Sequence, residues 1–203
     1  MIKNIIFDFG DVFINLDKQA TARMLIKSGF AGITPDLMEL FMSYETGIVS
    51  TEFFISRAKK WVPNATNEQL LAAWNAILLD FPEYRLEFLE KLARENRFRL
   101  FLLSNTNALH IDKVNEIMGT SQFQRFINCF EHCYFSHEVH MRKPDPEIFA
   151  HILQDRGLIP NQTLFIDDTE EHTISAESLG LYTWHLQVGK EDIIELNEKL
   201  PNV

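Results

Sequence analysis

Apolar residues run almost without interruption through several short segments of the chain, and this pattern predicts buried strands. The three most continuous segments are "KNIIFDF" at 3–9, "FRLFLLS" at 98–104 and "TLFIDD" at 163–168. Two shorter segments, "CYFS" at 133–136 and "YTWHL" at 182–186, are predicted as further strands. Nearly continuous apolar strands are typical of a parallel sheet that helices cover on both faces.

Helical patterns alternate with the later strands. They are "EYRLEFLEKLARE" at 83–95, "DPEIFAHILQDRG" at 145–157 and "EEHTISAESLG" at 170–180, where Gly180 is placed to end the helix. Alternation of strands and helices predicts a doubly wound α/β fold with a parallel, Rossmann-like sheet.

Residues 15–84 differ from the rest because they contain no convincing strand. They carry four helical patterns, at 17–29, 34–47, 50–62 and 66–80. Thr34 and Pro35 are suited to begin the second of these helices, and Thr66 with Gln69 forms a capping-box pattern for the fourth. We therefore expect a helical cap domain at 15–84, inserted into an α/β core domain made of 1–14 and 85–203.

Composition narrows the classes of function. The chain has 203 residues with a net charge of −10, which disfavours nucleic acids and anionic membranes as partners. No apolar run approaches the ~20 residues of a membrane-spanning helix, and the first residues lack the pattern of a signal peptide. With only two cysteines, the sequence favours a cytoplasmic protein.

One segment, "NCFEHCYFSHEVHM", gathers residue types that bind zinc. Cys129 and Cys133 lie four residues apart, and His132, His137 and His140 are close by. The spacing matches no usual zinc motif, and there is no second cysteine pair. The sequence therefore favours a structural turn that leads into a strand over a zinc site.

Polar side chains follow three of the predicted strands. Asp8 follows the first, Ser104 and Asn105 follow the second, and Asp167 with Asp168 follow the fourth. Because ligands bind at the carboxyl ends of the strands in an open α/β sheet, we expect these side chains to converge. Lys143, predicted to begin the helix before the fourth strand, adds a positive charge.

Such a set of groups suits phosphoryl transfer to a carboxylate. Asp8 can attack phosphorus, while Ser104 and Lys143 can hold phosphate oxygens. Mg²⁺ prefers oxygen ligands, which Asp8 and Asp168 can supply, and the metal offsets repulsion between an anionic nucleophile and an anionic phosphate. Gly10 lacks a side chain, so we expect its backbone to turn sharply and offer a carbonyl to the metal.

Four segments in this order resemble the motifs of the haloacid dehalogenase (HAD) superfamily. They are "IIFDFGDVF" at 5–13, "LFLLSNT" at 100–106, "RKPDPEIF" at 142–149 and "LFIDDTEEH" at 164–172. The insertion resembles the helical cap of subclass I. The segments "LSNTNALH", "MRKPDP" and "ETGIVSTEFF" are similar to the branch that contains bacterial α-D-glucose-1-phosphate phosphatase.

The resemblance implies a role for each matching position. Asp8 would be the nucleophile and a metal ligand, and Gly10 would bind Mg²⁺ through its carbonyl oxygen. Asp168 would bind the metal directly, and Asp167 directly or through water. Ser104 and the Asn105 amide would bind phosphate, and Lys143 would bind both phosphate and the Asp8 carboxylate. His172 and Asp11 depart from the usual pattern, which puts fine positioning in question.

Gly10 stands where most HAD phosphatases have an aspartate that acts as the general acid. Asp11 is favoured as a turn residue over a substitute proton donor, and His110 is a weaker candidate for the acid. Without an acid, we expect substrates with good leaving groups, such as sugar 1-phosphates, aryl phosphates and acyl phosphates. In the cap, Tyr44, Glu45 and Thr46 either face the substrate or form a polar helix end.

The sequence favours a Mg²⁺-dependent phosphatase acting on a small phosphorylated metabolite, plausibly a sugar phosphate, through an aspartyl-phosphate. One alternative is a metal-independent haloacid dehalogenase, in which the acidic pair Asp167 and Asp168 would have no purpose. Another is a non-catalytic binding protein of the same fold. Loss of the general acid argues for it, whereas retention of Asp8, Ser104, Lys143 and Asp168 together argues against it.

Overall fold

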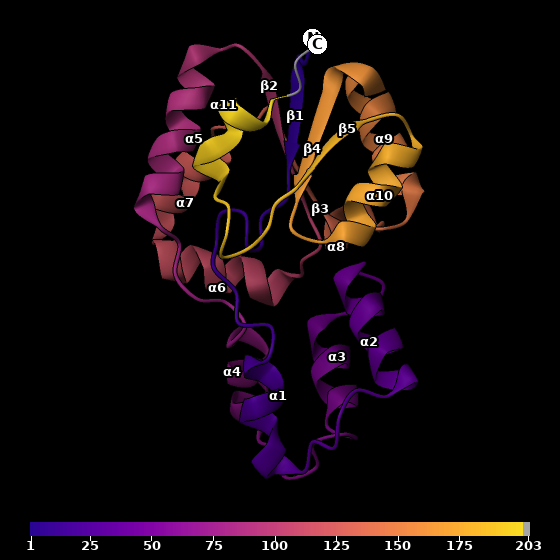
Figure 1. Ribbon diagram of the computed structural model, residues 1–203. Coiled ribbons are helices and arrows are strands. Elements are labelled where there is room, and N and C mark those ends of the chain that lie inside the picture. The colour runs from indigo at the N-terminus through magenta and orange to yellow at the C-terminus, as the bar shows by residue number, and fades with distance from the viewer. Residues whose placement is uncertain (201–203) are drawn as a thin grey trace.

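A computed structural model describes residues 1–200 as a five-stranded sheet surrounded by helices, with a helical lobe beyond one end of the strands (Figure 1). The strands are β1 (Asn4–Phe7), β2 (Arg99–Ser104), β3 (His132–Phe135), β4 (Thr163–Asp167) and β5 (Tyr182–His185). Their order is β3-β2-β1-β4-β5, and every neighbouring pair is parallel. The sheet extends in both directions from the central β1, so the predicted doubly wound α/β class is confirmed.

Side chains of β1 alternate between two apolar layers, as the pleat of a strand requires. Ile5 and Phe7 enter the core on one face, and Ile6 enters the core on the other; none of the three is exposed. Helices α5, α6, α7 and α11 supply the first layer, and α8, α9 and α10 supply the second (Figure 1). The strand is therefore buried on both sides, which explains its uninterrupted apolar sequence.

The predicted core helices begin and end close to where the sequence places them. Helix α5 spans Glu83–Glu95, and α10 ends just before Gly180, which adopts a left-handed φ of 85°. The sequence analysis did not predict α6 and α7, which lie in succession between β2 and β3, nor the short helices α8 and α11. The remaining core helices are α6 (Ala108–Met118), α7 (Thr120–Ile127), α8 (Ser136–Val139), α9 (Pro146–Arg156), α10 (Glu170–Ser178) and α11 (Leu196–Lys199), with short 3₁₀ turns at Pro160–Gln162 and Ile193–Glu195.

The helical lobe has an apolar core of its own. Tyr44 stacks on Phe54, with ring centroids 4.3 Å apart, and Trp74 packs against the same Phe54 ring. The predicted Thr66–Gln69 capping box is present at the start of α4. The lobe consists of α1 (Ala20–Leu25), a 3₁₀ turn (Ile26–Ser28), α2 (Pro35–Glu45), α3 (Thr51–Ala58) and α4 (Asn67–Asn75), and we call it the cap.

Two short linkers join the cap to the sheet domain and run side by side. The Leu79 amide donates to the Asn15 carbonyl at 2.9 Å, and the Asp17 amide donates to the Ile77 carbonyl at 2.8 Å. Leu16 and Leu78 form an antiparallel bridge between them. The predicted boundary after residue 14 falls at the start of the first linker, whereas the one after residue 84 falls in the first turn of α5. Domain boundaries at these positions remain a proposal.

A second connection links the end of α2 to α8, and we call it the latch. Ser136 Oγ donates to the Glu45 carbonyl at 2.6 Å, and a ring nitrogen of His140 lies 2.8 Å from the Thr46 carbonyl. Gly47 has a φ of 65°, and a Cβ there would lie 2.1 Å from the His137 carbonyl oxygen. Only glycine allows the two backbones to approach so closely.

Within residues 1–200, no helix combines the length and the apolar character needed to cross a membrane. This agrees with the absence of a long apolar run in the sequence.

Candidate active site

The polar residues predicted to converge do meet at the carboxyl edge of the sheet. Asp8 directly follows β1, Ser104 ends β2 and Asp167 ends β4. The Asp8 amide donates to the Ile166 carbonyl at 2.8 Å, which fixes the nucleophile candidate beside the end of β4. Parallel pairing of adjacent strands therefore brings residues far apart in sequence into one site.

Lys143 lies at the centre of this site with 1% of its side chain exposed. Its Nζ donates to Asp8 Oδ1 at 2.6 Å, to Asp167 Oδ2 at 2.5 Å and to the Leu103 carbonyl at 3.1 Å. All the protons of the ammonium group thus have acceptors, so the position of the charge is fixed. Lys143 lies in the loop before α9, not at the start of that helix as the sequence predicts.

Asp167 is completely buried and both of its carboxylate oxygens are engaged. Oδ2 accepts from Lys143, and Oδ1 accepts from the Thr169 amide at 2.8 Å. The His172 ring lies 3.0 Å from Oδ1. Burial acts to raise the pKa of Asp167, but the charge of Lys143 and the hydrogen bond from His172 outweigh it and lower that pKa to about 2. His172, the residue that departs from the family pattern, therefore holds this carboxylate in place.

The Asp8 carboxylate is buried but less completely paired. Burial raises the pKa of Asp8 to about 7, and the charges of Asp167 and Asp168 add to the effect, while Lys143 acts to lower it. The second oxygen, Oδ2, is not used by Lys143. One oxygen of Asp8 is therefore oriented by an ammonium group while the other remains available for chemistry.

The side chain of Asn105 positions Lys143 by bonding to the Lys143 backbone. The Asn105 side chain donates from Nδ2 to the Lys143 carbonyl at 2.8 Å and accepts at Oδ1 from the Lys143 amide at 2.9 Å. This two-way contact occupies both polar atoms of the side chain. The sequence predicts that an amide of Asn105 binds phosphate. Because the side-chain amide is bonded to Lys143, we assign this role to the backbone amide of Asn105.

The sharp turn expected at Gly10 lies one residue later. The residue with a left-handed backbone is Asp11, with a φ of 55°, and not Gly10. Asp11 Oδ1 accepts from the Leu16 amide at 3.0 Å, which stabilises that conformation. A Cβ placed on Gly10 would lie 2.7 Å from Leu16 Cδ1 and 4.0 Å from Asp8 Oδ2. Leu16 therefore fills the space into which a side chain at position 10 would project.

Lys18, which the sequence analysis did not single out, reaches the site from the first cap linker. Its Nζ lies 2.6 Å from Asp168 Oδ2 and 3.1 Å from Asp11 Oδ2. Both contacts raise the pKa of Lys18 above its ordinary value, against the effect of partial burial. No motif marks this lysine, because its role depends on how the linker folds back over the sheet.

The acidic residues satisfy the requirements of a hard cation. Carboxylate oxygens of Asp8, Asp167 and Asp168 all lie within 4.8 Å of one another, and no other group of three His, Cys, Asp or Glu in residues 1–200 is arranged in this way. The Lys18 ammonium beside Asp168 shows that the outer part of the cluster attracts positive charge. In the turn after β1, the Ile14 amide donates to the Phe9 carbonyl and the Asp11 amide donates to the Ile14 carbonyl. Neither of these hydrogen bonds uses the Gly10 carbonyl, which is therefore available to a metal. This all-oxygen donor set fits Mg²⁺.

Cap residues predicted to face the substrate have different positions. Glu45 lines a cavity in the cap and pairs with Arg142 of the sheet domain, with 3.2 Å between Oε2 and Nη2. Tyr44 is buried in the cap core, and the Thr46 hydroxyl donates to the Met42 carbonyl at 2.8 Å. Only Glu45 of the three is therefore turned toward the site.

His110 lies in the first turn of α6, and its ring stacks against Trp74 of the cap. One ring nitrogen lies 3.2 Å from the Trp74 carbonyl and the other 3.2 Å from Asn107 Nδ2. Burial lowers the pKa of His110 to about 4, so the ring is neutral at pH 7.

The cysteines and histidines of 128–141 form no metal cluster among the described residues. The Cys129 thiol donates to the Arg125 carbonyl, and burial raises the pKa of Cys133 to about 12. The segment leads into β3, as the sequence favours.

The sheet is parallel and doubly wound, a buried carboxylate follows its central strand, and a lysine and further acids lie beside that carboxylate. This arrangement is typical of a class of α/β hydrolases. A family model for haloacid dehalogenase-like hydrolases matches residues 2–180. The chain belongs to this family, so the predicted superfamily is confirmed. The predicted resemblance to the glucose-1-phosphate phosphatase branch stays a prediction.

Similar proteins cover the whole chain. A D-ribitol-5-phosphate phosphatase from Bacteroides thetaiotaomicron is 27% identical over 197 residues, which are 94% of this chain and 95% of that protein. A crystal structure of a HAD family enzyme from B. thetaiotaomicron, in complex with magnesium and inorganic phosphate, has 34% identity and a TM-score of 0.81, over 94% of this chain and 97% of that one. A predicted HAD-like family hydrolase from Porphyromonas gingivalis matches over 100% of both chains, with 29% identity and a TM-score of 0.85.

Proposed function

We propose that this protein is a Mg²⁺-dependent phosphatase that hydrolyses a small phosphomonoester through an aspartyl-phosphate at Asp8. The observation that carries the proposal is the buried ammonium of Lys143 between Asp8 and Asp167, with Asp168 beside them. The magnesium and phosphate complex of the similar B. thetaiotaomicron enzyme supports the metal and the substrate class.

Each residue then has a distinct task. Lys143 fixes one oxygen of Asp8, so that the other is aimed at phosphorus. The Ser104 hydroxyl and the Asn105 backbone amide bind phosphate oxygens, and the Lys143 charge favours an anion there. Asp8, Asp168 and the Gly10 carbonyl hold Mg²⁺, which when bound neutralises part of the phosphate charge.

Asp167 supports the metal site in a different way. Both of its oxygens already accept hydrogen bonds from protein groups. We therefore assign it to orient Lys143 and to act on the metal through water, the second of the two roles that the family resemblance allows.

The departing oxygen receives no help from position 10. Leu16 occupies the space that a side chain there would use, so good leaving groups are favoured, as the sequence predicts. The similarity to a D-ribitol-5-phosphate phosphatase supports a small phosphorylated metabolite as the substrate. The dehalogenase alternative is disfavoured because it gives the acidic cluster no role.

Phosphate release from acetyl phosphate and 4-nitrophenyl phosphate, with Mg²⁺ or with excess chelator, tests this function. We expect activity only with Mg²⁺, and a loss of about 10⁴-fold or more in Asp8→Asn. Asp112→Asn, an exposed aspartate on α6, is the matched control and should retain full activity.

A labelled phosphoenzyme trapped by acid quenching should appear in the wild type and be absent from Asp8→Asn. Full activity in chelator, or halide release from a 2-haloacid, would instead support the dehalogenase. No turnover of either phosphate would support a binding protein.

A further inference from the structure

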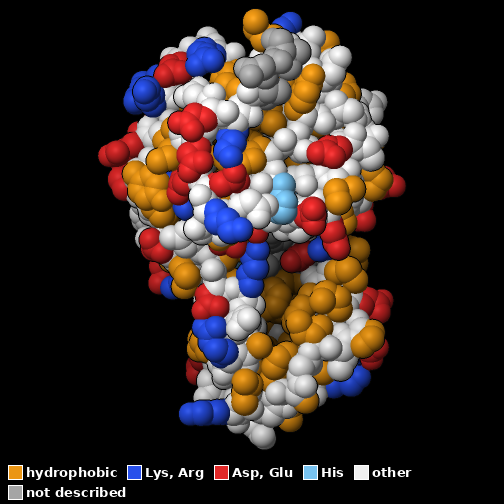
Figure 2. All heavy atoms as spheres, viewed as in Figure 1, with side chains coloured by type: hydrophobic (Ala, Val, Ile, Leu, Met, Phe, Trp, Pro, Cys, Tyr) orange, Lys and Arg blue, Asp and Glu red, His pale blue; other side chains and the backbone are white. Residues whose placement is uncertain are grey.

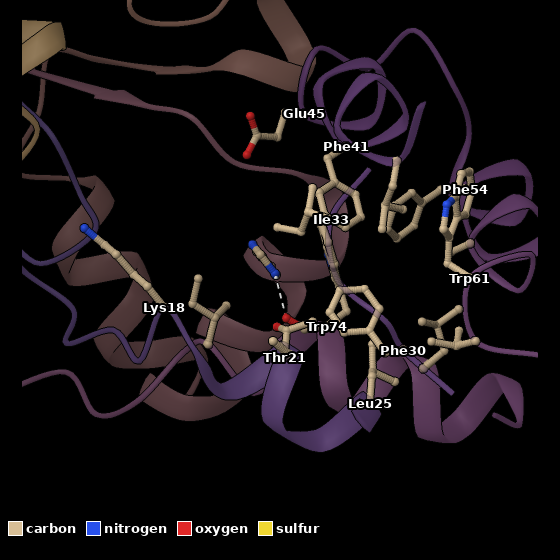
Figure 3. A pocket seen from close by; sticks show the side chains of 17 residues that line it. Lys18, Thr21, Leu25, Phe30, Ile33, Phe41, Glu45, Phe54, Trp61 and Trp74 are labelled. Atoms are coloured by element: carbon tan, nitrogen blue, oxygen red, sulfur yellow. Dashed lines mark hydrogen bonds between the residues drawn. The ribbon is translucent and has the colours of Figure 1, made fainter. Parts of the chain in front are cut away.

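The cap contains a cavity of about 210 Å³, lined by the cap and its linkers and by His110 of α6. Figure 3 shows Lys18 on one side of it, with Phe30, Leu25, Phe54 and Trp61 on the far side. Figure 2 shows the hollow between the two lobes, with apolar side chains around it. Because most of the lining side chains are apolar, the cavity favours an apolar occupant.

Polar atoms of the aromatic wall are already paired with protein. Trp61 Nε1 donates to Thr34 at 3.0 Å, and Trp74 Nε1 donates to Asn107 at 3.3 Å. Both ring nitrogens of His110 also have partners. A polyol in this cavity would leave several hydroxyl groups without hydrogen bonds, at a cost in affinity for each one.

Two residues that line the cavity also contact the region of the proposed active site. Lys18 lines the cavity and lies beside Asp168, with 2.6 Å between Nζ and Oδ2. Glu45 lines it from the cap and pairs with Arg142, the neighbour of Lys143. The side of the cavity formed by Lys18 and Glu45 is therefore the side that faces the proposed active site.

The volume sets the size of the group that the cavity admits. An apolar cavity of about 150 Å³ in another protein holds benzene, so about 210 Å³ admits an aromatic ring with a few further carbons. An apolar group of this size is bound through burial of its surface, which requires no hydrogen bonds.

We infer that the preferred substrates are phosphate monoesters of compact apolar phenols, whose aromatic ring and its substituents occupy the cap cavity. This inference rests on the proposed phosphatase function and names its substrate class, in place of the sugar phosphate expected from the sequence. It also agrees with Leu16 in the place of an acid.

The chemistry balances for an aryl phosphate. Asp8 forms the new oxygen–phosphorus bond, and the bond from phosphorus to the phenol oxygen breaks with its electron pair. The departing phenoxide is stable enough to leave unprotonated, because phenols have a pKa of about 10, and it takes a proton from solvent. Water then hydrolyses the aspartyl-phosphate and releases inorganic phosphate.

The test is a series of phenyl phosphates with hydrogen, methyl, ethyl or propyl at the para position. These groups hardly change phenol acidity, so differences report contacts in the cavity. We expect kcat/KM to rise about fourfold for each buried methylene until the cavity is filled, and to exceed the value for ribitol 5-phosphate. A flat series, or a preference for ribitol 5-phosphate, would overturn the inference.

A cavity-filling variant locates the effect. Ala22 on α1 lines the cavity, and Ala22→Leu should abolish the gain along the series while leaving acetyl phosphate hydrolysis within about twofold. Ala72→Leu, at an exposed position on α4, is the matched control and should keep the gain. Ala22→Val replaces the leucine variant if that one does not fold.

Failure of the inference and failure of the proposed function give different results. Hydrolysis of acetyl phosphate without a dependence on the para group refutes only the substrate class. A gain that persists in Ala22→Leu also refutes it, because the apolar group then binds elsewhere. Absence of phosphate release from every compound refutes the phosphatase itself.

Discussion

Replacement of Lys143 by methionine tests the central ion cluster most directly. At an effective dielectric constant of 20, a charge pair at the 2.6 Å between Lys143 and Asp8 has an attraction of about 6 kcal/mol. Much of this attraction offsets the desolvation of the buried charges. Loss of one partner from a buried pair typically costs about 3–5 kcal/mol, because the remaining charges stay buried without compensation.

We therefore expect Lys143→Met to lower the free energy of unfolding by about 3–5 kcal/mol at pH 7.5 in chelator. Urea unfolding followed by tryptophan fluorescence measures this change. Mg²⁺ should recover more stability in the variant than in the wild type, since the carboxylates of Asp8, Asp167 and Asp168 then lack their internal cation. Lys190→Met, at an exposed position, should change stability by less than about 0.5 kcal/mol.

A variant as stable as the wild type in chelator would show that the three carboxylates do not depend on Lys143. Equal stabilisation of both proteins by Mg²⁺ would show that the metal binds away from this cluster. Either result refutes the argument from buried charge.

Three further predictions concern the regions around the site. Arg85 is buried and donates hydrogen bonds to Asp192 and to the Phe13 carbonyl. Arg85→Met should therefore lower the free energy of unfolding, measured in urea, by about 2–4 kcal/mol. Loss of the exposed ion pair between Arg97 and Glu95 should change it little. Burial lowers the pKa of His110 to about 4, against about 6.5 in the unfolded chain, so the unfolded state binds the extra proton first. Stability should fall by up to about 3 kcal/mol as pH decreases from 6.5 to 4, and His110→Gln should remove this part of the decrease. Gly47→Ala should cost about 2–4 kcal/mol, because its Cβ would meet the His137 carbonyl; unchanged thermal stability would show that the latch tolerates displacement.

Strong local signals allowed much of the fold to be predicted from the sequence. Continuous apolar segments marked the strands, and caps such as Thr66 marked the cap helices. Helices α6 and α7 were missed although α7 has a clear apolar face and Asn107 caps α6. These helices follow one another with only Gly119 between them, so the segment lacks the strand–helix alternation that identified the others.

The site was predictable where residues lie at strand ends and less so where they come from loops. Asp8, Ser104 and Asp167 followed from the rule for open sheets. Lys18 could not be found in this way, because its contact with Asp168 depends on the path of a linker. The turn at Asp11, expected at Gly10, shows that an aspartate bonded to a nearby amide also adopts a left-handed conformation.

The paired linkers make the cap an exchangeable module. Asn15 and Asp80 bond each other at 3.0 Å where the chain leaves the sheet domain and returns to it. Because its two ends are held together, the insertion takes the place of a short loop between β1 and α5 of the sheet domain. The number of residues in the insertion then has little effect on the entropy cost of closing this connection. Under the proposed function, caps of different size or lining are compatible with one unchanged nucleophile, so specificity for the leaving group can evolve separately from the chemistry at phosphorus.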